Sequence, residues 1–325
     1  MNLSSVGGNV TSVGNYRDTF STAVAKNVVV VALCISINYI NGTLVHTFSK
    51  HQIFNVNPRY ILFIHLVIND IMQLTLSSFL HVISYVLYII NVPFCIILLI
   101  IAILTTLNTP LNLAGMAVEC YIAICIPLRH GQICTVKRTY VLIGLIWVTS
   151  AVCILPDVVI LLATEPLQFF HSRVLCDSDY VFRSTYSLEK REASHIVFLV
   201  LVWLTLFYTY FRILFAAKEA NTDVRKARNT ILLHGFQLLL CMLTYVQPML
   251  EKCLLYLFPR QHLATRFTCY IIVHILPRFV SPIVYGLRDQ TFRRYLKGYL
   301  LCKVSIRNHA VNVTMSSTGH AVKGQ

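Results

Sequence analysis

The chain has 325 residues, of which 56% are hydrophobic and 12% are charged, and its mean hydropathy is +0.67. This small number of charged residues cannot cover a water-facing surface, and the composition therefore excludes an ordinary soluble globular protein. The formal net charge of +14 would suit a nucleic-acid binder, but the distribution of the positive residues, described below, excludes that class.

Apolar runs of about 18 residues or more recur along the chain, and each is long enough to cross a bilayer of about 30 Å. Only helices or closed barrels satisfy the backbone in lipid, and these runs lack the alternating pattern of barrel strands. The sequence therefore predicts an all-α membrane protein, a bundle of seven transmembrane helices. In chain order the spans are expected near residues 27–49, 60–86, 94–125, 139–163, 194–217, 229–257 and 267–287.

Lysine and arginine are distributed unevenly among the segments that join these spans. If residues 1–26 lie outside the cell, 17 of the 27 positive residues fall in internal segments or, for Arg212, near the inner end of a span. Nine fall in external segments or, for Lys252, near the outer end of a span, and Arg278 lies within the last span. Cytoplasmic loops carry such an excess, so we expect a multi-pass plasma-membrane protein with its N-terminus outside. Anionic lipid of the inner leaflet adds to this preference. Membrane lipid, and not nucleic acid, is the expected partner of these charges.

Two segments lie outside the predicted bundle of residues 27–287. Residues 1–26 are expected to form an extracellular tail, in which Asn2 and Asn9 begin N-glycosylation sequons. Residues 288–325 are expected to be cytoplasmic and to begin with a short amphipathic helix on the inner leaflet. The short loops and the lack of an internal repeat predict one compact bundle.

The stretch from Met116 to Leu128, MAVECYIAICIPL, ends the third predicted span. It resembles the M-A-x-D-R-Y-x-A-I-C-x-P-L signature of odorant receptors, a branch of the rhodopsin-like G-protein-coupled receptors. Residues 226–234 resemble the K-A-x-x-T-C-x-x-H pattern of that family, and residues 277–288 resemble the run around its N-P-x-x-Y motif, most closely in the teleost group. The resemblance implies a chemoreceptor that binds a small-molecule odorant in the outer half of the bundle and activates a heterotrimeric G protein, which raises cAMP.

The resemblance also assigns the inner face. The acid of the signature is Glu119 and its tyrosine is Tyr121, but its arginine is Cys120, which supplies no positive charge. Coupling is then expected to depend on other basic residues, or to be weak or absent. The residues assigned to G-protein coupling are Glu119, Cys120, Tyr121, Arg129, Lys226, Arg228, His234 and Tyr285.

By the same family register, the ligand cavity lies among the outer halves of spans three, five, six and seven, and the matching residues come from spans three, six and seven. Ala102 stands where amine receptors carry an aspartate and Ile275 where opsins carry the retinal lysine, so neither class is expected. A mostly apolar site of this kind suits small neutral or weakly polar molecules. Contact between helices is the alternative role for Thr106 and Tyr245. The predicted ligand-binding residues are Ala102, Ile103, Thr106, Met242, Tyr245, Ile271, His274 and Ile275.

Two pairings follow from the resemblance. Cys95 begins span three and Cys176 lies in the longest outer loop, where rhodopsin-like receptors have a disulfide in an oxidising compartment. Asp70 matches the span-two acid that typically holds a sodium ion in the family, and Arg278 is an intramembrane cation one turn before Pro282. We expect Arg278 to pair with Asp70 in place of sodium, because a lone buried charge is costly. The alternative is that Arg278 reaches a water-filled cavity or another polar group.

Other functions stay open at this point. A rhodopsin-like receptor for a non-odorant metabolite or peptide would share the same motifs. A transporter or channel predicts repeated halves and a continuous polar path, and the sequence has no inverted repeat. No converging nucleophile, acid–base pair or metal-ligand pattern indicates an enzyme, so neither a cofactor nor a metal is expected.

Overall fold

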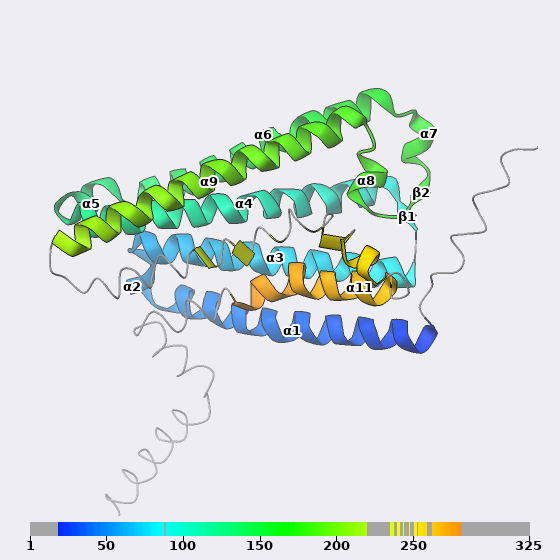
Figure 1. Ribbon diagram of the computed structural model, residues 1–325, viewed down its shortest axis with the longest axis horizontal. Helices are drawn as coiled ribbons and strands as arrows, with labels where there is room; N and C mark the ends of the chain where they lie inside the picture. The colour runs from blue at the N-terminus through cyan, green and yellow to red at the C-terminus, as the bar shows by residue number, and fades with distance from the viewer. Residues whose placement is uncertain are drawn as a thin grey trace, which may run out of the picture.

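The computed structural model describes residues 19–87, 89–219, 235–236, 239–240, 243, 247, 250–251, 253–258 and 262–280 of the chain. Six helices within these ranges are long and apolar enough to cross a membrane. They match six of the seven predicted spans, which confirms the all-α transmembrane fold class (Figure 1). The predicted span 229–257 falls largely on residues outside the description, and so do the predicted helix after residue 288 and the sequons at Asn2 and Asn9.

The elements follow one another along the chain as α1 (Phe20–Lys50), α2 (Gln52–Asn55), α3 (Pro58–Val86), β1 (Ile90–Asn91), α4 (Val92–Cys125), α5 (Pro127–Ile133), α6 (Val136–Thr164), α7 (Leu167–Phe170), β2 (Arg173–Val174), α8 (Ser178–Val181), α9 (Thr185–Glu219), α11 (His262–Tyr270) and the π-helical turn η2 (Ile271–Ile275). Residues 276–280 continue η2 as α-helix. We call the end of the bundle that carries β1, α7, β2 and α8 the α7 end, and the opposite end, which carries α2 and α5, the α5 end (Figure 1).

Two of the described helices begin at a capping side chain. The side chain of Asn57 accepts a hydrogen bond from the backbone N–H of Arg59, and Pro58 occupies the first turn of α3. Thr135 accepts from the backbone N–H of Arg138 in the same way at the start of α6. Each cap satisfies a donor that the first helical turn leaves without a partner.

Prolines set the ends of α4 and α6. Ile126 precedes Pro127 and leaves the helical conformation, with φ −134° and ψ 54°. Glu165 precedes Pro166 and is extended, with φ −89° and ψ 137°. The helical conformation is disfavoured for a residue before proline, so the chain turns at both of these points. The first turn separates α4 from α5, and the second begins the loop of the α7 end.

The helix α4 lies at the centre of the bundle. It packs against α3, α6 and α9, while α3 packs in turn against α1 (Figure 1). The main hydrophobic core lies where α1, α3, α4 and α9 meet, and its buried members include Leu44, Leu62, Leu66, Leu113, Met116, Val202 and Leu206. Several of the polar contacts described below are made by this central helix.

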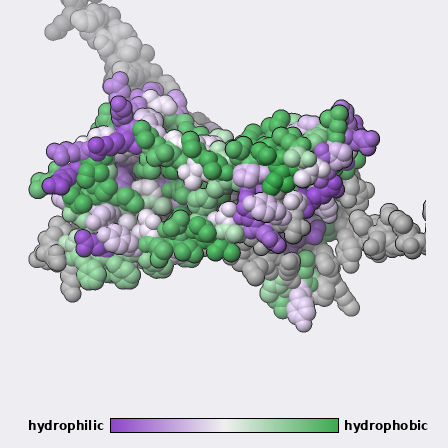
Figure 2. Space-filling view, turned by 90° about the horizontal axis from the view of Figure 1, so that it is seen from above, coloured by the Kyte–Doolittle hydropathy of each residue, from purple (hydrophilic) through white to green (hydrophobic). Residues whose placement is uncertain are grey.

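The outward face of α6 is apolar. Its buried side is formed by Ile146, Ser150, Ile154, Asp157 and Leu161. Its exposed side is formed by Val141, Leu145, Val148, Val152, Leu155, Val159 and Leu162. A helix of a soluble protein would carry polar residues on its exposed side, so this surface is suited to lipid. Figure 2 shows the same pattern, with hydrophobic residues over much of the middle of the molecule and polar residues gathered towards its ends.

The predicted disulfide is confirmed at the α7 end. Cys95 and Cys176 are bonded, with their Cα atoms 5.5 Å apart. Just before Cys95, the short strand β1 pairs antiparallel with β2, so that Ile90 lies opposite Val174. The disulfide and the strand pair together fix the loop between α6 and α9 to the start of α4.

Candidate functional site

The predicted ligand residues of α4 are partly buried. Thr106 Oγ1 accepts a hydrogen bond from Gln73 Nε2 at 2.7 Å and donates to the Ala102 carbonyl at 2.8 Å. Ile103 packs at the edge of the hydrophobic cluster beneath the loop of the α7 end. The Thr106 hydroxyl thus takes part in the contact between α3 and α4, the alternative to lining a ligand site. Ligand contact by these residues stays a prediction.

The predicted ligand residues of the last span all lie in the π-helical turn η2. His274 forms a hydrogen bond through Nε2 with Gln247 Oε1, 3.0 Å away, which links the turn to the predicted sixth span. Ile275 is buried and Ile271 is partly buried in a cluster that contains Val30 of α1 and Leu74 of α3. Turns of π-helix insert one extra residue and occur often at functional sites. The structure therefore brings His274 to the sixth span and the two isoleucines towards α1 and α3.

A neighbouring set of aromatic side chains was not foreseen from the sequence. The ring of His81 in α3 stacks on Tyr270 of α11 with centroids 4.4 Å apart, and Tyr270 lies 5.4 Å from the ring of His274. Lys26 of α1 places Nζ 5.5 Å from the centroid of Phe267. These contacts join α1, α3 and α11 beside η2. The signal that singled out His274, an imidazole within a span, applies equally to His81.

Asp70 and Arg278, the predicted ion pair, are both 3% exposed. Arg278 Nη1 donates to the carbonyls of Val273 at 2.8 Å and His274 at 3.2 Å. Pro277 has no N–H, so it cannot give the Val273 carbonyl its usual helical hydrogen bond, and the guanidinium supplies one instead. Within the described ranges, the ion pairs closer than 4 Å do not include Asp70 with Arg278. The contacts of Arg278 with these carbonyls fit the alternative, in which it reaches another polar group. The pairing with Asp70 stays a prediction.

A different buried ion pair joins α6 to α9, and the sequence did not reveal it. Lys190 Nζ lies 2.8 Å from Asp157 Oδ1 and donates to the Cys153 carbonyl at 2.7 Å. Asp157 is 7% exposed, and a carboxylate buried to this degree needs a counter-charge. The available signal was a single acid within the apolar run 139–163.

Buried amide side chains fix α4 against its neighbours. Asn69 Nδ2 of α3 donates to the Thr105 carbonyl at 2.8 Å and to Thr109 Oγ1 at 2.9 Å. Ser150 of α6 donates to Asn108 Oδ1 at 2.7 Å. Hydrogen bonds between helices replace the hydrophobic driving force that lipid does not provide. They therefore fix the position of α4, the helix that carries the predicted ligand residues of span three.

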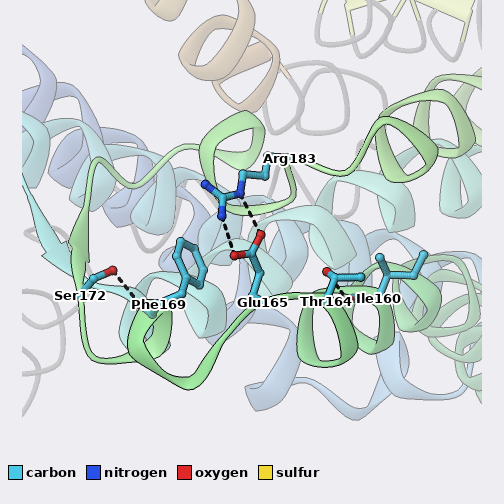
Figure 3. Close-up of polar contacts among 6 residues, drawn as sticks. All are labelled: Ile160, Thr164, Glu165, Phe169, Ser172 and Arg183. Carbon is cyan, nitrogen blue, oxygen red and sulfur yellow. Dashed lines mark hydrogen bonds and ion pairs between the residues drawn. The ribbon is translucent and has the colours of Figure 1, made fainter. Parts of the chain in front are cut away.

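An ion pair closes the loop at the α7 end. Arg183 Nε donates to Glu165 Oε1 at 2.8 Å and Nη2 donates to Oε2, and the ring of Phe169 lies 5.2 Å from the guanidinium carbon (Figure 3). This bidentate hydrogen bond to the Glu165 carboxylate raises the pKa of Arg183. Beneath the loop lies a hydrophobic cluster of Ile90, Cys95, Leu98, Leu99, Leu161, Val181 and Phe182.

The predicted coupling residues that the structure describes lie at the α5 end. Glu119 is 7% exposed, and its Oε1 lies 3.1 Å from Nε2 of His130. Cys120 is buried beside it, and the ring of Tyr121 lies 6.0 Å from that of Tyr208 in α9. Arg129 is exposed. The other predicted residues, Lys226, Arg228, His234 and Tyr285 for coupling and Met242 and Tyr245 for the ligand, lie outside the described residues.

Comparison with known proteins agrees with this arrangement. The sequence profile of the family "7 transmembrane receptor (rhodopsin family)" matches residues 40–285. Odorant receptor 131-2 of Danio rerio is 30% identical to the chain over 328 residues, which cover 96% of this chain and 98% of that protein. Proteins of this class are membrane receptors and not enzymes. The chain therefore belongs to the rhodopsin family of seven-transmembrane receptors, in its odorant-receptor branch.

Proposed function

We propose that this chemoreceptor binds a small, weakly polar molecule between α4 and the helix formed by α11 and η2. The observation that carries the proposal is the π-helical turn Ile271–Ile275, whose His274 bonds to Gln247 of the sixth span. A ligand that favours another packing of this turn would move the sixth span through that hydrogen bond. Ligand energy acts on the receptor only through such a difference in affinity between two packings.

The chemistry of the proposed site defines the ligand class. Ala102 and Ile103 of α4 are apolar, so the site favours a largely hydrophobic molecule. Ile271 and Ile275 pack towards α1 and α3, and their contact with the ligand stays a prediction. His274 provides a hydrogen-bonding group for one hydroxyl, carbonyl or similar function. An odorant-type compound has this combination, and the zebrafish relative is named as an odorant receptor.

The proposed topology places the α7 end outside the cell and the α5 end inside. The excess of lysine and arginine in the segments assigned to the interior supports it. The disulfide at the α7 end supports it as well, because such bonds persist in oxidising compartments. An epitope tag at the N-terminus is expected to stain intact cells. Staining only after permeabilisation, with the receptor at the plasma membrane, would overturn the topology.

The proposed partner at the α5 end is a heterotrimeric G protein, with a rise in cAMP as its output. Leu128 of α5 is 96% exposed and stands next to the exposed Arg129. A fully exposed leucine beside a positive charge, beyond the end of a span, suits docking by another protein. Glu119 and Cys120 are buried behind this surface. Lys226, Arg228, His234 and Tyr285 stay predicted contributors to G-protein coupling.

The decisive experiment expresses the receptor with a cAMP reporter and records membrane conductance in the same cells. A panel of waterborne amino acids, amines, steroids and alcohols serves as the set of test compounds. An active compound is expected to raise cAMP, and His274→Ala is expected to change its potency by about ten-fold, the size of one lost hydrogen bond.

The matched control for this experiment is His171→Ala, an exposed histidine of the α7 end. Both variants should reach the cell surface at the wild-type level. Unchanged potency in His274→Ala would remove that residue from the site. Currents that persist without G protein would favour a channel or transporter instead.

A further inference from the structure

Three buried polar atoms at the contact between α3 and α11 have no hydrogen-bond partner in the part of the chain that the structure describes. They are Ser78 Oγ, His81 Nε2 and the hydroxyl oxygen of Tyr270, which together are called the polar patch. The two helices lie side by side towards the α7 end (Figure 1). A buried polar group without a partner carries the full cost of its lost hydration. Such groups persist where water or a ligand completes them.

The members of the polar patch are neighbours in space. Ser78 and His81 are three residues apart in α3 and therefore share one face of that helix. The ring of Tyr270 stacks on that of His81 with centroids 4.4 Å apart. The Tyr270 hydroxyl faces Ser77 and Ser78 but does not meet the geometry of a hydrogen bond to either. The polar patch therefore presents its three groups together, along the contact between α3 and α11.

The polar patch adjoins the proposed ligand site. Tyr270 immediately precedes η2, and its ring lies 5.4 Å from that of His274. Leu74, one turn of α3 further from the α7 end than Ser78, belongs to the same hydrophobic cluster as Ile271 of η2. Polar groups thus lie nearer the α7 end, with apolar side chains behind them. This order suits a molecule that has a polar head and an apolar chain.

A positive charge lies beside the polar patch. Lys26 of α1 places Nζ 5.5 Å from the centroid of the Phe267 ring and donates to the Leu263 carbonyl at 3.2 Å. The Phe267 ring in turn lies 6.0 Å from the ring of His81. Hydroxyl donors near a positive charge favour an anionic acceptor over a neutral one. A carboxylate is ionised at neutral pH and then only accepts hydrogen bonds, so its chemistry matches the polar patch.

We propose that Ser78, His81 and Tyr270 form a subsite for the carboxylate of a small aliphatic acid, whose apolar chain lies along η2. The inference rests on the proposed function, because it names the head group of a ligand that binds beside η2. The two hydroxyls donate to the carboxylate oxygens, and His81 donates through Nε2. Binding of one head group thus completes all three members of the polar patch.

The test compares straight-chain acids from butanoic to octanoic acid with the alcohols of the same chain lengths. Isothermal titration calorimetry on the full-length receptor in lipid nanodiscs gives the dissociation constant of each probe. At least one acid is expected to bind about ten-fold more tightly than its alcohol, the size expected for a hydrogen bond to a charged group. An alcohol enters lipid more readily than an ionised acid, so partitioning does not produce this order. Failure of every acid to bind more tightly than its alcohol would overturn the inference.

Conservative variants locate the carboxylate. Tyr270→Phe keeps the ring that stacks on His81 and removes only the hydroxyl. It is expected to weaken binding of the acid about ten-fold and binding of the alcohol by less, and Ser78→Ala should act in the same direction. Tyr256→Phe is the matched control, since Tyr256 is 86% exposed, and it should leave both affinities unchanged. Equal affinity of the wild type and Tyr270→Phe for the acid would contradict the proposal.

Thermal unfolding without ligand separates a ligand subsite from a structural contact. Because the Tyr270 hydroxyl has no partner in the described part of the chain, Tyr270→Phe is expected to keep or raise the unfolding temperature. A lower unfolding temperature in Tyr270→Phe than in Tyr256→Phe would show that the hydroxyl bonds within the protein, and it would sink the subsite.

The same probes distinguish this inference from the proposed function. If the alcohols bind as tightly as the acids and His274→Ala weakens both, the carboxylate subsite is wrong and the proposed ligand site stands. If the acids bind more tightly and lose affinity in Tyr270→Phe, but His274→Ala changes nothing, the subsite stands and the proposed role of His274 is wrong.

Discussion

At the α7 end, a disulfide, a strand pair, an ion pair and a hydrophobic cluster fix the loop to the helices. At the α5 end, side-chain hydrogen bonds of His130 and Arg138 connect α5 to α4 and α6. The first set includes a covalent bond, whereas each contact of the second set contributes on the order of 1 kcal/mol. A receptor built in this way keeps the shape of its proposed ligand side while its proposed signalling side can change partners.

The largest effect should come from the disulfide. Cys95→Ser is expected to lower the free energy of unfolding by about 2–5 kcal/mol, because the bond closes a long loop. Thermal unfolding in detergent and surface labelling of an N-terminal tag both measure this loss. Cys253→Ser is the matched control, since Cys253 is free and exposed. Equal stability of the two variants would remove the main difference between the ends.

Variants of Arg278 test the helix formed by α11, η2 and residues 276–280. Arg278→Met is expected to destabilise the receptor by about 1–3 kcal/mol, because the Val273 carbonyl loses its donor. Adding Pro277→Ala restores a backbone N–H for that carbonyl, so the double variant should recover much of the loss in thermal unfolding.

The predicted pairing with Asp70 gives the opposite result in the same experiment. If Arg278 chiefly neutralises Asp70, then Asp70→Asn should rescue Arg278→Met and Pro277→Ala should not. The two second-site variants thus separate a role in bonding the backbone from a role in pairing charge.

A smaller effect is expected at the start of α6. Thr135→Ala removes the cap that accepts from Arg138 and should cost about 1 kcal/mol in thermal unfolding. Asn57→Ala, which removes the corresponding cap of α3, is the matched comparison. A loss from Thr135→Ala as large as that from Cys95→Ser would mean that the α5 end is as strongly held as the other.

The smallest effect should come from Arg183. Arg183→Lys keeps the positive charge but cannot form the bidentate hydrogen bond with Glu165. The exposed position of Arg183 predicts almost no change in thermal unfolding, but faster limited proteolysis of the loop at residues 165–184. A marked drop in unfolding temperature would show that the ion pair, and not the disulfide, dominates the α7 end.

The sequence predicted the helices because length and apolar character alone identify a membrane span. It also predicted the disulfide, through the family resemblance. It did not foresee the pair of Lys190 with Asp157 or the hydrogen bond of His130, because such contacts depend on how each helix is rotated and where its ends turn. The π-helical turn was equally hidden, since one inserted residue leaves the hydropathy of residues 267–287 unchanged.

The hydrophobic cluster beneath the loop of the α7 end has a consequence for how stimuli reach the interior. Side chains of α4, α6 and the loop, such as Leu98, Leu161 and Phe182, pack together in this cluster. A hydrophobic stimulus reaches a higher concentration in the surrounding bilayer than in water. Lateral entry between helices therefore competes with entry from the aqueous side. The apparent sensitivity of the receptor would then follow the oil–water partition coefficient of each stimulus as well as its fit.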